Sequence, residues 1–326
     1  MHILITGAAG MIGRKLTERL VRDGALNGQP IDRLTLLDVS TPSRPAGFKG
    51  RADCAAVDIS DPAAARTAVA DTPEVIFHLA AVVSGEAELD YEKGFRVNFQ
   101  GSYALLEAVR ATGGYRPRFI FASSLAVFGA PFPPAIPDDF CTTPLTSYGT
   151  QKAMIELLLA DYSRRGFLEG VGLRLPNIVV RPGGPNKAAS GFFSSIIREP
   201  LNGQEAVLPV DESVLSWHAS PRSAAGFFVH AAGVDRQALG PRVNLTMPGV
   251  CCTVAEEIAA LRRIAGDKVA SRIRREPDPL IVRMVAGWPK RLDPARALAL
   301  GFRVEASFDE IVRVHIDDEL GGKIPS

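Results

Sequence analysis

The chain has 326 residues, of which 46 % are hydrophobic and 22 % charged, so it can fill the core of one large domain or of two modest ones. A formal net charge of +1 without a basic cluster argues against nucleic acid or an acidic membrane surface as a partner. No apolar run approaches the roughly 20 residues that cross a bilayer, and the start of the chain lacks the features of a signal peptide.

Cysteine usage points to a reducing compartment. The four cysteines are scattered along the chain, and they form neither a disulfide framework nor a metal-ligand spacing. We therefore expect a cytoplasmic protein without a metal site. These cysteines are Cys54, Cys141, Cys251 and Cys252.

The first half of the sequence alternates short apolar runs with helical patterns, which is typical of a parallel sheet covered by helices on both faces. Between the first two runs, residues 11–23 carry Ile12, Leu16 and Leu20 on one helical face. The pattern predicts an α/β fold built on a doubly wound Rossmann sheet. The predicted strands are 2–6, 34–38, 54–58, 75–79, 118–122 and 172–175.

Two longer helices are predicted over residues 91–112 and 147–165. Both carry more apolar surface than packing on one face of a sheet requires. We therefore expect these two helices to form a homodimer interface.

The strict alternation weakens after Leu175, and proline and glycine crowd residues 181–185. We expect residues 1–180 to form the Rossmann domain and residues 181–326 a smaller α+β domain over the strand ends. A strand near 243–246 is expected to return to the main sheet. In the second part, a helix is predicted over 253–265, and two helices around a turn at Gly301 within 292–319.

Three glycines follow the first predicted strand directly and open the first helix. Their G-x-x-G-x-x-G spacing permits a tight turn and a close approach of the backbone to a pyrophosphate. The helix N-terminus offers that anion free N–H groups and a partial positive charge. The pattern alone is a weak signal, but its place between a strand and a helix predicts a dinucleotide site. The residues of this loop are Gly7, Gly10, Met11, Ile12 and Gly13.

Residues at the ends of the next strands extend the predicted dinucleotide site. Asp38 ends the second predicted strand, where such folds place the acid that binds the adenosine ribose. A carboxylate there repels a 2′-phosphate, so NAD is favoured over NADP. Asp58, beside Ile59, is expected either to meet the adenine amino group or to cap the following helix. Three small or apolar residues suited to flat packing against the cofactor end the fourth strand: Leu79, Ala80 and Ala81.

Tyr148 and Lys152 stand four residues apart, so they share one face of a helix. A free tyrosine has a pKa of about 10, which is too high for a base at neutral pH. A nearby ammonium favours the phenolate and lowers that pKa. The pair can then act in general acid/base catalysis near physiological pH.

These features occur in an order that resembles the extended short-chain dehydrogenase/reductases, the NAD-dependent epimerase/dehydratase family. A glycine pattern, a serine after the fifth strand and Tyr-x-x-x-Lys follow one another, and the resemblance covers essentially the whole chain. It implies that Ser124 donates a hydrogen bond to the reacting oxygen, that Tyr148 is the acid/base, and that Lys152 tunes Tyr148 and contacts the ribose of NAD. The further cofactor contacts that it implies are Asn98, Ser123 and Pro176.

Residues 82–87, 181–190 and 197–201 resemble a group within this family that oxidises the C2 hydroxyl of D-erythronate, a four-carbon sugar acid, to the 2-oxo acid. A small sugar acid needs its carboxylate anchored, and arginine does this with two parallel hydrogen bonds. Arg222 is the first candidate and Arg181 the second. The other expected substrate contacts are Ser84, Ser124, Tyr148 and Asn186.

Two other functions remain open on the sequence. A nucleotide-sugar 4-epimerase would use the same three catalytic residues but would need a pocket for a diphosphate and a uracil ring. A non-catalytic NAD-binding regulator is less favoured, because such proteins usually lack the tyrosine or the lysine, and both are present here.

Overall fold

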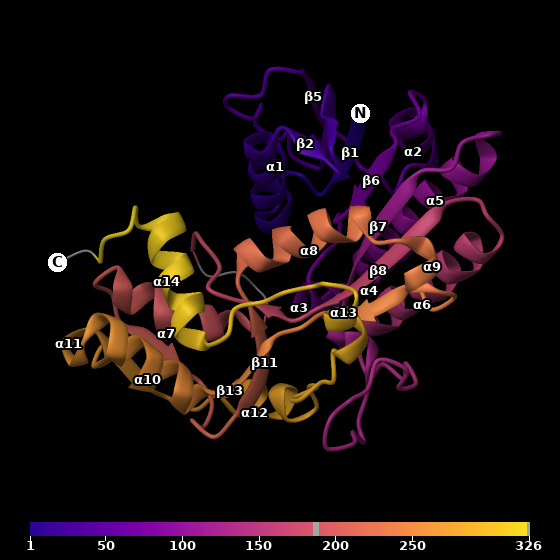
Figure 1. The fold of residues 1–326 in the computed structure, drawn as a ribbon. Coiled ribbons are helices and arrows are strands. Elements are labelled where there is room, and N and C mark those ends of the chain that lie inside the picture. Colours follow the sequence, from indigo (N-terminus) through magenta and orange to yellow (C-terminus); the bar gives the residue numbers. More distant parts are fainter. Residues whose placement is uncertain (185–188, 325–326) are drawn as a thin grey trace.

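The structure, a computed structural model, describes residues 1–184 and 189–324. Its centre is one parallel sheet of seven strands: β1 (His2–Thr6), β4 (Arg33–Asp38), β5 (Arg51–Ala56), β6 (Val75–His78), β7 (Arg118–Ser124), β8 (Glu169–Leu175) and β12 (Asn244–Thr246). In space the order is β12-β8-β7-β6-β1-β4-β5, which confirms the doubly wound Rossmann sheet (Figure 1). The strand predicted near 243–246 does return to this sheet, beside β8.

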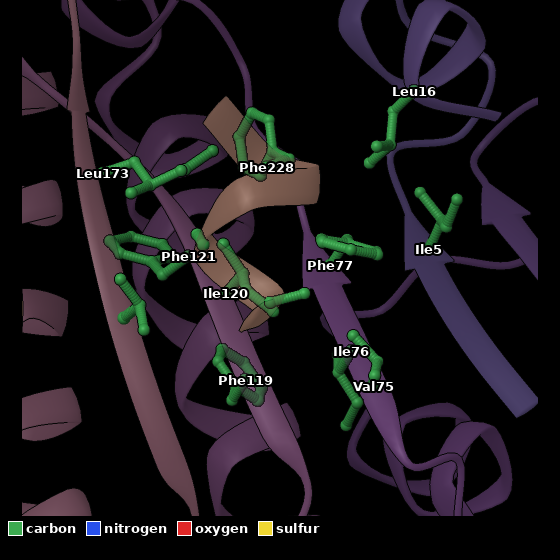
Figure 2. Packing of buried hydrophobic residues seen from close by; sticks show 14 of the residues in the cluster. Ile5, Leu16, Val75, Ile76, Phe77, Phe119, Ile120, Phe121, Leu173 and Phe228 are labelled. Carbon is green, nitrogen blue, oxygen red and sulfur yellow. The ribbon is translucent and has the colours of Figure 1, made fainter. Parts of the chain in front are cut away.

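Helices cover both faces of the sheet, as the sequence predicted. On one face α1 (Met11–Asp23) packs against α8 (Pro221–Gly233), and on the other α2 (Pro62–Val69), α5 (Ser102–Ala111) and α6 (Ser147–Arg164) form the covering layer (Figure 1). Phe77 of β6 meets Phe228 of α8 edge to face, with ring centroids 6.3 Å apart (Figure 2). The strands read as continuous apolar runs because both of their faces are buried.

The single helix predicted over residues 91–112 is a composite. It consists of α4 (Tyr91–Gly94), a π-helical segment η1 (Phe95–Gly101) and α5, preceded by the short α3 (Ser84–Leu89). The wider π turn buries Asn98 and Gly101 against the rest of the protein. Periodicity at 3.6 residues per turn predicts the helix but cannot reveal this local change of pitch.

The C-terminal part of the chain has a second hydrophobic core of its own. Two small sheets contribute to this part: β9 (Asn177–Ile178) with β11 (Leu215–Ala219) and β13 (Val250–Thr253), and β10 (Ala206–Leu208) with β14 (Ile273–Arg275). The helix predicted over 253–265 is α10 (Val254–Ala265), and the two helices predicted around Gly301 are α13 (Ala295–Ala299) and α14 (Phe308–Glu319). The remaining elements are β2 (Ala25–Leu26), β3 (Gln29–Pro30), η2 (Leu125–Val127), α7 (Gly191–Leu201), α9 (Arg236–Leu239), α11 (Asp267–Ala270) and α12 (Pro279–Ala286).

Because α8 and β12 come from the second half yet pack on the Rossmann sheet, the chain crosses between its two parts more than once. The division into 1–180 and 181–326 stays a prediction. Among residues 1–184 and 189–324, no helix combines the length with the hydropathy that a membrane span requires.

Candidate active site

A cavity of about 380 Å³ lies at the carboxyl ends of the central strands, where open α/β sheets bind their ligands. Its walls come from the glycine loop, the ends of β6, β7 and β8, the start of α6 and the beginning of α7. Most residues that the sequence assigned to a site meet here. They are Gly7, Gly10, Met11, Ile12, Gly13, Leu79, Ala81, Ser84, Ser123, Ser124, Tyr148, Lys152, Pro176 and Arg181.

The glycine loop forms a cradle that side chains would fill. Gly7 has φ +76°, and a Cβ added there would lie 2.6 Å from the backbone nitrogen of Ala80. A Cβ on Gly13 would lie 2.2 Å from the carbonyl oxygen of Gly7. Gly10 caps α1 without a side chain, and the first turn of α1 contains no acidic residue. The open helix N-terminus and the bare loop therefore fit the pyrophosphate of a dinucleotide.

Gly13→Ala tests this cradle. The new methyl group must displace the backbone of the loop, so we expect NAD⁺ affinity to fall at least about tenfold, together with a lower melting temperature. Calorimetric titration with NAD⁺ measures the first effect and thermal unfolding the second. Gly226→Ala in α8 is the matched control, because its Cβ would meet nothing within 4 Å. Equal NAD⁺ affinity in the Gly13 variant and the wild type would contradict the assignment of the glycine loop to the pyrophosphate.

The two acids expected at the adenosine end, Asp38 and Asp58, are not among the residues that line the cavity. The carboxylate of Asp38 accepts a hydrogen bond from the backbone N–H of Ala9, at 3.0 Å, which places it against the glycine loop. The prediction that Asp58 closes the third strand is wrong, since β5 ends at Ala56. Asp58 instead accepts hydrogen bonds from Ser60 and pairs with Arg96 at 2.6 Å. It does not cap the following helix either, since the N-cap of α2 is Asp61.

Asn98, Ala80 and Ile59 lie behind the cavity wall rather than in it. Asn98 is fully buried, accepts the N–H of Val82 at 2.9 Å and donates to the side chain of Gln151 at 2.8 Å. It thus holds the segment after β6 against α6. The backbone of Ala80 supports Gly7, and Ile59 is buried beside η1.

Tyr148 and Lys152 do share one face of α6, and Ser124 stands opposite them at the end of β7. The ammonium of Lys152 lies 5.6 Å from the ring centre of Tyr148. Thr146 caps the helix by accepting the N–H of Gly149, which fixes the start of α6 and hence the phenol.

The electrostatics of the pair differ from the sequence-based expectation. Burial raises the pKa of Tyr148 to about 12, and the Ser124 hydroxyl and Arg181 guanidinium only partly offset this rise. Burial also lowers the pKa of Lys152 to about 7, while the carboxylate of Glu156 acts in the opposite direction. The ammonium of Lys152 alone therefore does not make the phenol acidic. Deprotonation of Tyr148 depends on the other charges of the site.

Arg181 is the cation at the substrate end of the cavity. Its guanidinium donates to the carbonyl of Ile178 and to the hydroxyl of Ser190, both at 2.9 Å. It lies close enough to Tyr148 for each group to shift the pKa of the other. Among the residues that the structure describes, no carboxylate forms an ion pair with Arg181. Such a half-buried, unpaired guanidinium is suited to the carboxylate of a ligand.

Arg222, the first candidate for binding the substrate carboxylate, does not line this cavity, so that prediction is wrong. Arg222 opens α8 at the surface and pairs with Asp318 of α14 at 2.6 Å. Asn186 lies outside the described residues.

Arg198 is a cavity residue that sequence reasoning missed. It lies on α7, donates to the carbonyl oxygen of Arg181 at 2.8 Å and pairs with Glu199 at 2.5 Å. Residues 197–201 resemble the same family group, but that resemblance gives Arg198 no role. Its contact with Arg181 spans an intervening loop, so only the fold reveals it.

A cluster that the sequence did not predict lies in the second core. His218, Cys252 and Glu257 are buried there, with one potential ligand atom of each within 4.8 Å of the others. Nε2 of His218 lies 3.0 Å from the carboxyl group of Glu257, whose pKa is raised by burial. The aromatic rings of Phe193 and Phe308 flank the imidazole edge to face. The prediction of no metal site stays a prediction.

Comparisons with known proteins bear on this site. Residues 3–219 match the model of the NAD dependent epimerase/dehydratase family. The D-erythronate dehydrogenase of Cupriavidus necator is 48 % identical over 323 residues, covering 98 % of this chain and 98 % of that protein. The D-erythronate dehydrogenase of Haemophilus influenzae is 40 % identical, covering 98 % of this chain and 100 % of that protein.

Solved structures give the same fold. A crystal structure described as the nucleoside-diphosphate-sugar epimerase from Agrobacterium tumefaciens is 60 % identical with a TM-score of 0.97, covering 100 % of this chain and 96 % of that one. The UDP-glucose 4-epimerase of Thermus thermophilus, in complex with NAD, is 24 % identical with a TM-score of 0.79, covering 99 % of this chain and 100 % of that one. At this lower identity the likeness shows the fold alone. The family model matches two thirds of this chain, and the two dehydrogenases align with 98 % of it. The chain therefore belongs to the NAD dependent epimerase/dehydratase family, whose cofactor is NAD, and is a homologue of dehydrogenases in that family.

Proposed function

We propose that the protein is a D-erythronate dehydrogenase that oxidises the C2 hydroxyl of the acid to the 2-oxo acid with NAD⁺. The observation that carries this proposal is Arg181, a guanidinium without an ion-pair partner among the described residues, beside Tyr148. In a 2-hydroxy acid, the carboxylate is bonded to the carbon that is oxidised. A cation next to the catalytic phenol is therefore where this substrate needs it.

In the proposed mechanism each side chain has one task. Ser124 donates a hydrogen bond to the C2 oxygen, and Tyr148, as phenolate, accepts the proton of the C2 hydroxyl. Lys152 supplies positive charge behind Tyr148, and Arg181 fixes the carboxylate so that C2 lies over the phenol. Ser84, at the start of α3, is assigned to the substrate hydroxyls. When bound, NAD⁺ supplies the hydride acceptor, so that C2 loses a hydride while its hydroxyl loses a proton.

The proposed NAD site uses the cradle of glycines and the open N-terminus of α1 for the pyrophosphate. Asp38 is assigned to the adenosine ribose, where its charge disfavours a 2′-phosphate. Asp58, with Ile59, is assigned to the adenine and Ser123 to the nicotinamide end. Pro176, Leu79 and Ala81 would line the cofactor. Ala80 and Asn98 would support this wall from behind, Ala80 through its backbone at Gly7 and Asn98 through its hydrogen bonds to Val82.

A nucleotide-sugar epimerase is the second candidate, because the 60 % identical structure carries that description. A hexose moiety presents neutral hydroxyls to the catalytic tyrosine and leaves its phosphates further away. The positive charge of Arg181 would then lie beside a neutral sugar, which offers no negative charge to pair with it. This chemistry favours the sugar acid.

The test is a panel of aldonic acids, D-erythronate among them, offered with NAD⁺ and NADP⁺ and followed by absorbance of the reduced nicotinamide. Epimerisation of UDP-glucose and UDP-galactose is measured in parallel. We expect oxidation of D-erythronate with NAD⁺ and no interconversion of the UDP-hexoses. Turnover of a UDP-hexose without oxidation of any aldonic acid would decide for the epimerase.

We also propose a cytoplasmic homodimer. Four aromatic rings contact one another in succession along α4, η1 and α5, those of Tyr91, Phe95, Phe99 and Tyr103. Of these, Tyr91 and Tyr103 are 54 % and 42 % exposed. Leu157 of α6, the neighbouring helix, is 69 % exposed. An apolar face of this kind in two adjacent helices fits a second copy of the chain.

Leu157→Glu is expected to shift the protein from dimer to monomer, because it places a charge in the proposed interface. Light scattering after size-exclusion chromatography measures the mass directly. Leu298→Glu, at a 42 % exposed position in α13, is the control and should leave the mass unchanged. A wild-type protein that is monomeric at micromolar concentration would contradict the dimer.

A further inference from the structure

A buried carboxylate that the mechanism does not use lies one helical turn beyond Lys152. Glu156 on α6 is 2 % exposed. It accepts a hydrogen bond from the Ser123 hydroxyl at 2.5 Å and from Nε and Nη2 of Arg174, at 3.1 and 2.8 Å. A carboxylate is buried at this depth only when such partners satisfy it. Glu156 therefore joins three elements under the cavity: α6, β7 and β8.

Lys152 is also buried, with 1 % of its surface exposed, and it faces Phe121 at 4.8 Å from the ring centre. Burial lowers the pKa of the Lys152 ammonium to about 7, and the negative charge of Glu156 opposes this decrease. His78 of β6 is a further titratable group near Lys152, but its imidazole is neutral at physiological pH. It is held between the hydroxyls of Thr6 and Ser102, and burial lowers its pKa to about 3.

Two further titratable groups lie here among the described residues: Tyr148 on α6, beside Lys152, and Arg174 on β8, beside Glu156. Arg174 also donates to the carbonyl of Asp138, at 2.9 Å, and lies over the ring of Phe128. The carboxylate of Glu156 pairs with the buried Arg174 and also acts on the buried Lys152, so one negative charge serves both cations. Removing that charge would leave both cations in a poorly solvated place.

We propose that Glu156 is a positioning residue for the reaction, which keeps Lys152 charged and, through Ser123, holds the end of β7 that carries Ser124. This role rests on the proposed function, in which the charge of Lys152 assists the deprotonation of Tyr148. Glu156 itself touches neither the cavity nor the reacting atoms.

Glu156→Gln keeps the size of the side chain and an oxygen that accepts hydrogen bonds, but it removes the charge. Lys152 then loses its proton at lower pH, so Tyr148 is harder to deprotonate. We expect the rise of kcat/KM with pH to move to higher pH by about one unit, which is a tenfold loss at a fixed pH on that limb. Glu156→Asp, which keeps the charge, should restore most of the profile.

Glu107→Gln is the matched control. Glu107 also accepts a hydrogen bond from a side chain of α6, the hydroxyl of Tyr162, and pairs with Arg110, but it does not face Lys152. Loss of the charge of Glu107 should leave the dependence of kcat/KM on pH unchanged. A merely structural role for Glu156 would lower activity at every pH in the same proportion and leave the shape of the profile unchanged.

A second measurement needs no turnover. In protein with ¹³C-labelled lysines, the Cε signal of Lys152, identified with Lys152→Met, is followed against pH. We expect its pKa to fall by about one unit in Glu156→Gln and to stay at the wild-type value in Glu107→Gln. Arg174→Gln removes the competing cation and should raise that pKa, so it tests the same balance if Glu156→Gln does not fold.

An unchanged pKa of Lys152 in folded Glu156→Gln would overturn the proposal. If Glu156→Gln does not fold, an unchanged pKa of Lys152 in Arg174→Gln would overturn it instead. The outcome is separate from that of the proposed function. If the wild-type protein oxidises no aldonic acid but the Lys152 signal shifts as expected, the substrate assignment fails and the role of Glu156 stands.

Discussion

Tyr148→Phe is expected to lower kcat for D-erythronate oxidation by about 10³-fold, since a positioned acid/base contributes about 10²- to 10⁴-fold. The phenylalanine keeps the ring that packs near Lys152 but has no oxygen to accept the proton. The glycine cradle is untouched, so NAD⁺ binding should persist. Steady-state kinetics by nicotinamide absorbance and calorimetric titration with NAD⁺ separate the two effects.

Tyr162→Phe is the control for this loss. Tyr162 is a buried tyrosine on the same helix, but its hydroxyl donates a hydrogen bond to Glu107 and it lies outside the cavity. The kcat of Tyr162→Phe should therefore stay near the wild-type value. The wild-type enzyme should also show kcat/KM rising with pH from neutrality, because the pKa of Tyr148 is raised and its deprotonated form is the base. Full activity in Tyr148→Phe would remove the proposed base.

Arg181→Met is expected to lower kcat/KM for D-erythronate by about 30- to 4000-fold, which corresponds to the 2–5 kcal/mol typical for truncating one partner of a buried, hydrogen-bonded charge pair. Most of the loss should lie in KM, because the guanidinium binds the carboxylate in the ground state as well as in the transition state. Arg181→Lys should recover only part, since an ammonium cannot donate two parallel hydrogen bonds.

Arg222→Met is the matched control, because this arginine forms its ion pair with Asp318 at the surface, away from the cavity. Its kcat/KM should equal that of the wild type. A polyol such as erythritol, which lacks the carboxylate, should be as poor a substrate for the wild type as for Arg181→Met. If Arg222→Met lost substrate affinity and Arg181→Met did not, the assignment of the anchor would be reversed.

Local patterns made the Rossmann half predictable. The helix over residues 11–23 has the predicted bounds because its apolar spacing, glycine N-cap and Gly24 stop all act within a few residues. The glycine loop and the Tyr148–Lys152 pair are equally local, since each is one turn or one helix face. Their meeting in one cavity follows from the rule that parallel strands end at the same edge of the sheet.

The parts that the sequence did not reveal depend on contacts between distant segments. The sheet of β9, β11 and β13 joins strands from three separate regions. Arg222 was a candidate anchor on the sequence, but its ion-pair partner, Asp318, lies 96 residues further along the chain, so only the fold reveals that pair. The raised pKa of Tyr148 is likewise a consequence of burial, which spacing on a helix does not disclose.

The most direct test of the central claim is the fate of the hydrogen on C2. With D-erythronate deuterated at C2 and NAD⁺, we predict that the deuterium passes to the reduced nicotinamide while the 2-oxo acid forms in equal amount, and that Tyr148→Phe suppresses both products together. Reduced nicotinamide without deuterium, or an oxo group at a carbon other than C2, would contradict the account.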